Sequence, residues 1–170
     1  MLRLLGALLI AGASLAIGLS YIAGEARKLN DLRSFVLLLK EMCGELGVRA
    51  SPLPELLELL GRRCGGCGGS FAASLHSRMN ELGEKEFSQL WNECLTVFSR
   101  YLESEEREQL QTLGLCLGRY ELDRQLSELE ICINFLDSRI AGYSSLLPEK
   151  RRMGLGLACS LGALLLIVLI

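Results

Sequence analysis

Histidine and aromatic residues are scarce in this sequence. Its 170 residues include one histidine, His76, one tryptophan, Trp91, and 6% aromatic residues in total. A Ser-His or Cys-His catalytic pair would have to use His76, but no nucleophile motif stands beside it. The sequence also lacks a glycine-rich loop followed by Lys and Ser or Thr, the pattern that binds nucleotide phosphates. We therefore expect neither an enzyme nor a cofactor-binding protein, and we assign no catalytic residue.

Closely spaced cysteines are also rare, although the chain has seven cysteines. The one such pair is Cys64-Gly-Gly-Cys67, whose spacing suits a zinc knuckle or a redox pair, and Arg62 and Arg63 would lower the pKa of its thiols. A tetrahedral zinc site needs four ligands, and no second pair of this spacing supplies them. We therefore expect no bound metal and interpret the segment as a flexible glycine loop. A membrane-tethered thiol sensor built on Cys64 and Cys67 is the alternative.

Apolar residues are abundant, at 50% of the chain with a mean hydropathy of +0.32, and they concentrate at the two ends. Leu4–Ala23 and Gly154–Ile170 are almost purely apolar, whereas Gly24–Arg152 holds 37 of the 38 charged residues. Twenty helical residues span roughly 30 Å, the thickness of the hydrocarbon layer of a bilayer. We expect transmembrane helices over 1–24 and 153–170 and a folded domain over 25–152. A cleaved signal peptide ending near Ala11-Gly12-Ala13 is the alternative for the first segment.

Basic residues flank the central domain on both sides. Arg27, Lys28 and Arg33 follow the first apolar segment, and Lys150–Arg152 precede the second. Positive charge beside a membrane span favours the cytoplasmic side, so we expect the domain in the cytoplasm. Residues 34–149 carry 11 Lys and Arg against 18 Asp and Glu, a balance of −7. Nucleic acid is therefore not an expected partner.

Small residues recur at four-residue spacing in both apolar segments. Such a row allows two membrane helices to approach closely, although glycine and alanine are common in membrane helices in any case. The candidate contact residues are Gly12, Ala16 and Ser20 in the first segment and Gly154, Ala158 and Gly162 in the second.

Apolar spacing predicts long helices at both ends of the domain. One narrow stripe consists of Leu29, Leu32, Val36, Leu39, Cys43 and Leu46, and a second consists of Leu122, Leu126, Leu129, Ile133, Leu136, Ile140, Tyr143 and Leu147. The second should stop at Pro148, which lacks an N–H. Because one helix leaves the membrane and the other returns to it, we expect them to pack antiparallel.

Shorter helices are predicted between these two. A helix capped by Ser51 should run to Leu60 and stop at Gly61, and another should lie around 71–82. The best amphipathic pattern covers 87–102 and centres on Trp91. Ser104 should cap a further helix, with Glu105, Glu106 and Glu108 as its solvated first turn. No stretch alternates like a strand, so the fold class is an all-α bundle of five or six helices.

Five central residues are candidates for packing or partner contact. Trp91 should lie in the core, and the spacing of Gly114 and Gly118 suits a close helix crossing or, less simply, a partner contact. Glu121 and Gln125, on the next helix, are candidate surface or interhelical polar contacts.

The order of these features resembles the stage III sporulation protein AB family over nearly the whole chain. The resemblance rests on the Leu-Leu-Gly-Ala-Leu-Leu-Ile start, the Ser51-Pro52-Leu53-Pro54-Glu55 turn, the Trp91 helix, Leu113-Gly114 and Leu117-Gly118 before Gln125, and the apolar end. Where the family usually has Leu-Gly-x-Ser-Asp, this chain has Leu117-Gly118-Arg119-Tyr120-Glu121, and the Cys64–Cys67 segment is not part of the family pattern.

The resemblance implies a function. A protein of this family is a component of the channel between the mother cell and the forespore, in the mother-cell membrane around the forespore. Its cytoplasmic domain is similar to that of the platform protein of type II secretion systems, and its partners are a secretion-type ATPase and ring-forming membrane proteins. We therefore expect a non-catalytic membrane platform, with a generic membrane-anchored helical scaffold outside sporulation as a further alternative.

Overall fold

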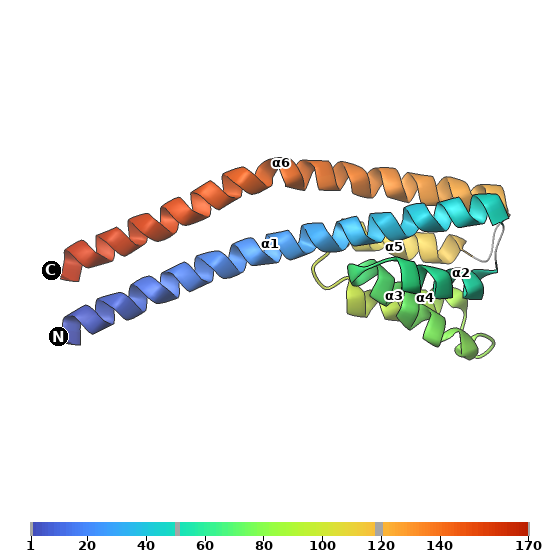
Figure 1. Cartoon of the computed structure of the whole chain (residues 1–170), viewed down its shortest axis with the longest axis horizontal. Coiled ribbons are helices and arrows are strands. Elements are labelled where there is room, and N and C mark those ends of the chain that lie inside the picture. The colour runs from blue at the N-terminus through green and yellow to red at the C-terminus, as the bar shows by residue number, and fades with distance from the viewer. Residues whose placement is uncertain (1, 50–51, 118–120, 170) are drawn as a thin grey trace. The chain divides into compact units, whose positions relative to one another are not determined.

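The computed structural model describes residues 2–49, 52–117 and 121–169, and these residues are almost entirely helical (Figure 1). The helices, in chain order, are α1 (Leu2–Arg49), α2 (Leu53–Arg63), α3 (Gly66–Ser77), the 3-10 helix η1 (Met79–Glu81), α4 (Phe87–Phe98), α5 (Ser104–Cys116) and α6 (Leu122–Leu169). Over the described ranges no strand forms, and one isolated bridge joins Leu82 to Lys85. The predicted all-α class is confirmed.

Backbone contacts divide the chain into two units. One consists of residues 28–140, and the other combines residues 1–27 with 141–170. In the second unit the two terminal segments are helical over their described residues, and both chain termini lie at the same end of it (Figure 1). Most side chains of the two predicted membrane spans lie outside the described set. Within that set, no helix combines the length and the apolar character needed to cross a bilayer.

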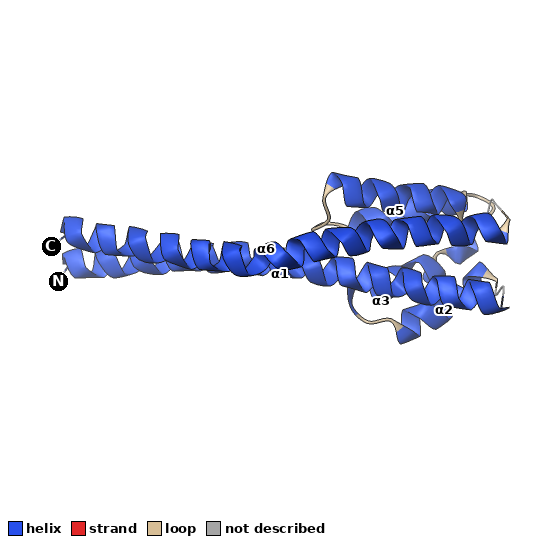
Figure 2. Cartoon of the chain, turned by 90° about the horizontal axis from the view of Figure 1, so that it is seen from above, coloured by secondary structure: helices blue, strands red, loops and turns tan. Residues whose placement is uncertain are grey.

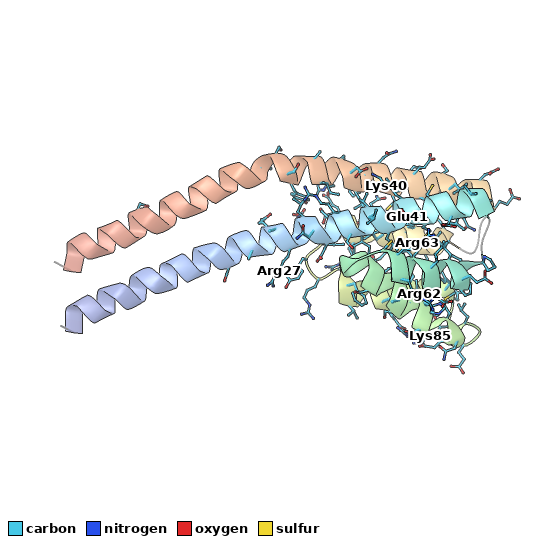
Figure 3. The ribbon with its side chains drawn as sticks, in the orientation of Figure 1. Arg27, Lys40, Glu41, Arg62, Arg63 and Lys85 are labelled. Atoms are coloured by element: carbon cyan, nitrogen blue, oxygen red, sulfur yellow. The ribbon has the colours of Figure 1, made fainter. Side chains whose placement is uncertain are left out.

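In the unit of residues 28–140, α1 and α6 run antiparallel and lie side by side (Figures 1 and 2). Lys40 Nζ donates to Asp137 Oδ2 at 2.8 Å, and a Cβ at Gly47 would lie 4.0 Å from Leu126. Figure 3 shows Lys40 on the side of α1 that faces α6. The antiparallel pairing of the first and last helices of the domain is therefore confirmed.

The buried face of α1 is wider than the predicted stripe. Five of the six stripe residues are buried, and Cys43 is half-buried. Phe35, Leu38 and Met42 form a second row with no exposed surface. The second row exists because α1 packs against α6 on one side and against the shorter helices on the other (Figure 2).

Two predicted helix ends were wrong. Helix α2 continues past Gly61 to Arg63, and a Cβ at Gly61 would lie 3.1 Å from the backbone of Ala73 on α3. This glycine permits close helix packing and does not end the helix. Likewise, α6 continues through Pro148 to Leu169. An interior proline removes one intrahelical hydrogen bond and disfavours a helix, but the backbone of α6 is helical on both sides of position 148, so Pro148 does not end it. The predicted cap Ser51 lies outside the described residues.

The helices around Trp91 also begin and end differently from the prediction. Helix α4 ends at Phe98, so Tyr101 is not helical and is exposed, although Leu102 is buried. The cap of α5 is Glu103, whose N–H donates to Glu106 Oε2 at 2.8 Å in a capping box, and Ser104 is the first helical residue. The segment predicted around 71–82 forms α3 and η1 and begins five residues earlier, at Gly66.

Candidate functional site

The Trp91 side chain lies in the core, where α4 crosses α5. It has no exposed surface, and its Nε1–H donates to the carbonyl oxygen of Leu110 at 2.8 Å. An ideal Cβ at Gly114 would lie 2.2 Å from Trp91 Cδ1, closer than two carbon atoms can approach. The indole ring therefore occupies the space that a side chain at position 114 would need.

Trp91 belongs to an aromatic cluster that joins three helices. Phe71 on α3 lies at the centre, with ring centroids 4.8 Å from Trp91, 5.6 Å from Phe35 and 6.3 Å from Phe98. Phe87 lies 5.9 Å from Trp91. Edge-on aromatic pairs add packing energy to the burial of their surface, so this cluster fixes α3 and α4 against α1.

The glycine segment after Cys64 is not a flexible loop. Gly66 begins α3 with a φ of +69°, and Gly68 is buried against α1, where a Cβ would lie 2.5 Å from the carbonyl oxygen of Ser34. The Ser34 hydroxyl donates to the Gly65 carbonyl oxygen at 2.8 Å and accepts from the Gly68 N–H at 2.7 Å. These glycines allow the first turn of α3 to touch the α1 backbone.

The thiols of this segment are not activated, contrary to the prediction from Arg62 and Arg63. Cys64 is buried, and burial followed by the charge of Glu41 raises the pKa of its thiol, outweighing the opposite effect of Arg63. Burial and the charge of Asp31 raise the pKa of the Cys67 thiol to about 11. The Cys67 thiol donates to the Phe98 carbonyl oxygen at 2.9 Å. Both cysteines are free and mainly protonated at neutral pH.

A cluster of five charged side chains joins α1, α5 and α6, and we call it the charge clamp. Lys28 pairs with Glu103 and lies 3.8 Å from Glu106 Oε1. Arg139 lies 2.9 Å from Glu103, 3.2 Å from Glu105 and 3.6 Å from Glu106. The Glu106 side chain has no exposed surface, so the prediction of a solvated first turn was wrong for this residue. A buried carboxylate is stable as an ion only when it is paired and hydrogen-bonded, as here.

Sequence reasoning missed the charge clamp, although the sequence carries two signals for it. Lys28 precedes Leu29 on the apolar side of the first helix, and Arg139 precedes Ile140 on the last, so each cation borders a buried stripe. Glu103 and Glu106 also have the three-residue spacing of a capping box, which directs the second carboxylate back towards the helix start.

A second charged cluster fixes the segment between η1 and α4. Arg78 Nε lies 2.8 Å from Glu81, Lys85 Nζ lies 3.0 Å from Glu93, and Arg78 also reaches Glu93. The Arg78 hydrogen bond is the main cause that lowers the pKa of Glu81 to about 2. Gly83 permits the tight turn with a φ of +112°. In Figure 3, Lys85 lies on the far side of this unit from α6.

Within the part of the chain that the structure describes, no three His, Cys, Asp or Glu side chains gather in an arrangement that could hold a metal ion. An open hollow of about 250 Å³ lies on the outer surface of α2, lined by Glu55, Glu58, Leu59 and Arg62. His76 Nδ1 lies 3.0 Å from the Pro54 carbonyl oxygen, a contact that joins α3 to the start of α2.

Of the five predicted central residues, Trp91 and Gly114 meet where α4 crosses α5. Glu121 precedes α6 and is exposed, and its carbonyl oxygen accepts from the Gln125 N–H at 3.1 Å. Gln125 is half-buried on the first turn of α6, and Gly118 lies outside the described residues.

Most of the predicted contact residues of the terminal segments have side chains outside the described set. Gly12 and Ser20 are exposed, and no side chain would meet a Cβ at Gly12 within 4 Å. The surroundings of Ala16, Gly154, Ala158 and Gly162 lie outside the described set.

We compared the chain with known protein families, curated proteins and solved structures. No curated protein and no solved structure matches the chain. The family model for stage III sporulation protein AB matches residues 3–170, which include both apolar ends and every helix of the bundle. The chain therefore belongs to the stage III sporulation protein AB family.

Proposed function

We propose that the protein is a non-catalytic membrane platform of the channel between the mother cell and the forespore. In this proposal the two terminal helices anchor it in the mother-cell membrane around the forespore, and the helical bundle faces the mother-cell cytoplasm. The bundle docks a secretion-type ATPase and ring-forming membrane proteins. Family membership supports the role in sporulation, and the particular role as a platform is our inference.

The sequence supports the anchoring. The apolar runs at 4–23 and 154–170 have lengths that suit a bilayer, and basic residues follow the first and precede the second. Helix α1 contains the first run and continues into the bundle, and helix α6 continues from the bundle into the second run. A movement of the bundle could therefore reach the membrane through two helices.

A binding role suits the bundle better than catalysis. Its largest side chains, such as Trp91 and Phe71, are buried in the core. Its buried carboxylate Glu106 is paired within the charge clamp. Residues 34–149 carry a charge balance of −7, which favours a partner with a basic docking surface. The similarity to the platform of type II secretion systems is part of the proposal and guides the choice of the ATPase as partner.

One observation carries the proposal: the family match covers both apolar ends together with the bundle. A generic helical scaffold outside sporulation does not account for a sporulation family match of this length. A thiol sensor is disfavoured because Cys64 is buried and the pKa of both thiols is raised.

Co-purification from sporulating cells tests the platform role. The full-length chain, carrying an affinity tag, should retain the sporulation ATPase after extraction into mild detergent, while an unrelated membrane protein with the same tag should not. If neither the ATPase nor a ring protein is recovered with the chain, the platform proposal fails. A double variant, Cys64→Ser with Cys67→Ser, should sporulate normally, and complete loss of sporulation would favour the thiol sensor instead.

A further inference from the structure

Within the unit of residues 28–140, the α1–α6 pair has one broad face that no other described helix of this unit covers. In Figure 2, α5 lies beside α6, and α2 and α3 lie beside α1, so the outward sides of the pair remain exposed. We call this surface the outer face. Along it, exposed residues recur at three- and four-residue spacing, with Leu37, Lys40 and Gly44 on α1 and Ile131, Asn134 and Ser138 on α6.

The outer face has the size and the apolar content of a protein interface. Leu37 is 49% exposed, and Ile131 is 55% exposed. Each helix contributes about 20 residues, and with a rise of about 1.5 Å per residue and a helix diameter of about 10 Å the face covers about 600 Å². A standard interface buries about 800 Å² on each partner. Contact over the outer face would therefore approach the area of a specific complex.

The two helices carry opposite charges on the outer face. Helix α1 contributes Arg33 and Lys40, and α6 contributes Glu130 and Asp137. Lys40 and Asp137 pair with each other but keep 52% and 44% of their side chains exposed. Both can therefore take part in a further contact with an incoming surface.

The opposite-signed charges of each helix point to other sides. Asp31, Glu41 and Glu45 lie on the sides of α1 that face α3 and α2, where their charges act on Cys67 and Cys64 or pair with an arginine of α2. Arg124 and Arg139 lie on the side of α6 that faces α5. The outer face is therefore basic along α1 and acidic along α6.

A surface with one basic and one acidic helix is complementary to a second copy of itself. Two copies can meet face to face about a two-fold axis in two ways. If the axis runs across the helices, α1 lies on α1 and α6 on α6, and like charges meet. If the axis runs along the helices, α1 of each copy lies on α6 of the other, and opposite charges meet. Electrostatic complementarity favours the second arrangement.

Large and small residues also match in the second arrangement. The contacts between α1 and α6 place Gly44 at about the level of Ile131 and Leu37 at about the level of Ser138. An axis along the helices preserves these levels, so Ile131 of one copy faces Gly44 of the other, where a Cβ would meet nothing within 4 Å. In the same way, Leu37 faces Ser138. A large residue opposite a small one lets two helices pack closely.

We propose that the protein dimerises through the outer face, with the two-fold axis along α1 and α6. Two helices from each copy then form a four-helix bundle in which all neighbours are antiparallel. Lys40 and Asp137 of both copies alternate in sign around the axis at one level. This inference concerns residues 28–140 alone and depends neither on the membrane anchoring nor on the ATPase.

Charge reversal tests the interface through the choice of partner. Two full-length chains with different affinity tags are produced together, captured through the first tag in mild detergent and assayed for the second. One chain carries Lys40→Glu and the other carries Asp137→Lys. Pairs of one variant bring four like charges together at the axis, whereas the mixed pair has opposite charges between the copies. We expect several-fold more of the second tag from the mixed pair than when both tags carry the same variant.

A matched control reverses the ion pair between Glu58 and Arg62, which is exposed on α2. Chains with Arg62→Glu and Glu58→Lys should co-purify equally well in mixed and same-variant combinations, as two parent chains do. Equal recovery from both combinations of the Lys40 and Asp137 variants would overturn the proposal, because association through another surface does not respond to these charges. The proposal also fails if two parent chains do not co-purify. Circular dichroism checks that each variant is folded.

Ile131→Ser tests the apolar contact in the same assay. Its introduction into both tagged chains should lower the recovery of the second tag several-fold, because it removes the large side chain that faces Gly44. Leu115→Ser is the matched control, because Leu115 is 48% exposed on α5, away from the outer face. Equal losses in the two variants would contradict the proposed interface.

Discussion

At the residue scale, the packing of Trp91 requires a glycine at position 114. The indole ring fills the space above Gly114 and donates its N–H to the carbonyl oxygen of Leu110, one turn earlier on α5. A larger residue at 114 would have to displace a ring that has no exposed surface. Interiors this tightly packed respond to a single added methyl group.

Gly114→Ala should therefore lower the free energy of unfolding by about 1–3 kcal/mol. The change is measured by urea denaturation of the detergent-solubilised chain, with Trp91 fluorescence as the signal. Gly44→Ala is the matched control, because Gly44 lies within α1 and a Cβ there would meet nothing within 4 Å. The control should stabilise the chain by up to about 1 kcal/mol through helix propensity. A destabilisation of the same size in both variants would contradict the steric explanation.

At the scale of the elements, ion pairs connect helices that are distant in the sequence. The charge clamp joins α1 to α5 and α6, and its central carboxylate, Glu106, has no exposed side-chain surface. By contrast, Lys40 and Asp137 join α1 to α6 with 52% and 44% of their side chains exposed. Solvent screens the second contact far more than the first.

Glu106→Gln should cost about 3 kcal/mol of the free energy of unfolding. The amide keeps the shape of the carboxylate but leaves Lys28 and Arg139 without a buried negative partner. Asp137→Asn, the control at the exposed pair, should cost less than about 1 kcal/mol. Urea denaturation of the two variants at neutral pH gives the comparison, and equal losses would show that Glu106 is not effectively buried.

The cluster around Arg78 makes the free energy of unfolding depend on pH in the acidic range. The pKa of Glu81 is lowered from 4.5 to about 2, mainly by its hydrogen bond with Arg78, and the same arginine lowers the pKa of Glu93. The unfolded chain takes up protons at a higher pH than the folded chain, so this stabilisation is complete above about pH 5 and falls as the pH drops towards 2. Urea midpoints measured across this range should decrease.

Arg78→Gln should make that decrease shallower, because Glu81 then titrates nearer its ordinary range. Arg100→Gln removes the same charge from an exposed arginine for which the structure describes no ion pair, and it should leave the acid response unchanged. An acid response in Arg78→Gln that equals that of the parent chain would show that another group causes it.

At the scale of the whole molecule, the proposed orientation is open to test through an exposed position. Cys64 and Cys67 are poor reporters because burial raises the pKa of both thiols. Val48, near the end of α1, is 84% exposed. A thiol at this position should react freely with reagents in the surrounding water.

Val48→Cys should react with a membrane-impermeant maleimide in inverted membrane vesicles and not in intact cells. The parent chain, treated in the same way, gives the background from the native cysteines. Labelling of intact cells would place the bundle outside the cytoplasm, which would remove the argument for docking a cytoplasmic ATPase.

The sequence alone determined the helical class, the antiparallel pairing of the first and last bundle helices, and the family, because these depend on apolar spacing and on feature order along the chain. It did not place the ends of α2 and α6, because the preferences of Gly61 and Pro148 against a helix are weak guides to where a helix ends. At Gly61 the close approach of Ala73 on α3 requires a glycine inside the helix.

Only the tertiary structure decided the roles of the glycine segment and of Glu106. From local sequence, we predicted a flexible loop for the glycine segment and a solvated side chain for Glu106. In the structure, Gly68 packs against the α1 backbone, and Glu106 lies close to cations from α1 and α6. Ser34, Lys28 and Arg139 are each more than thirty positions away from these residues in the chain. The physical reason is that steric fit and charge pairing depend on distance in space, which short-range sequence patterns do not encode.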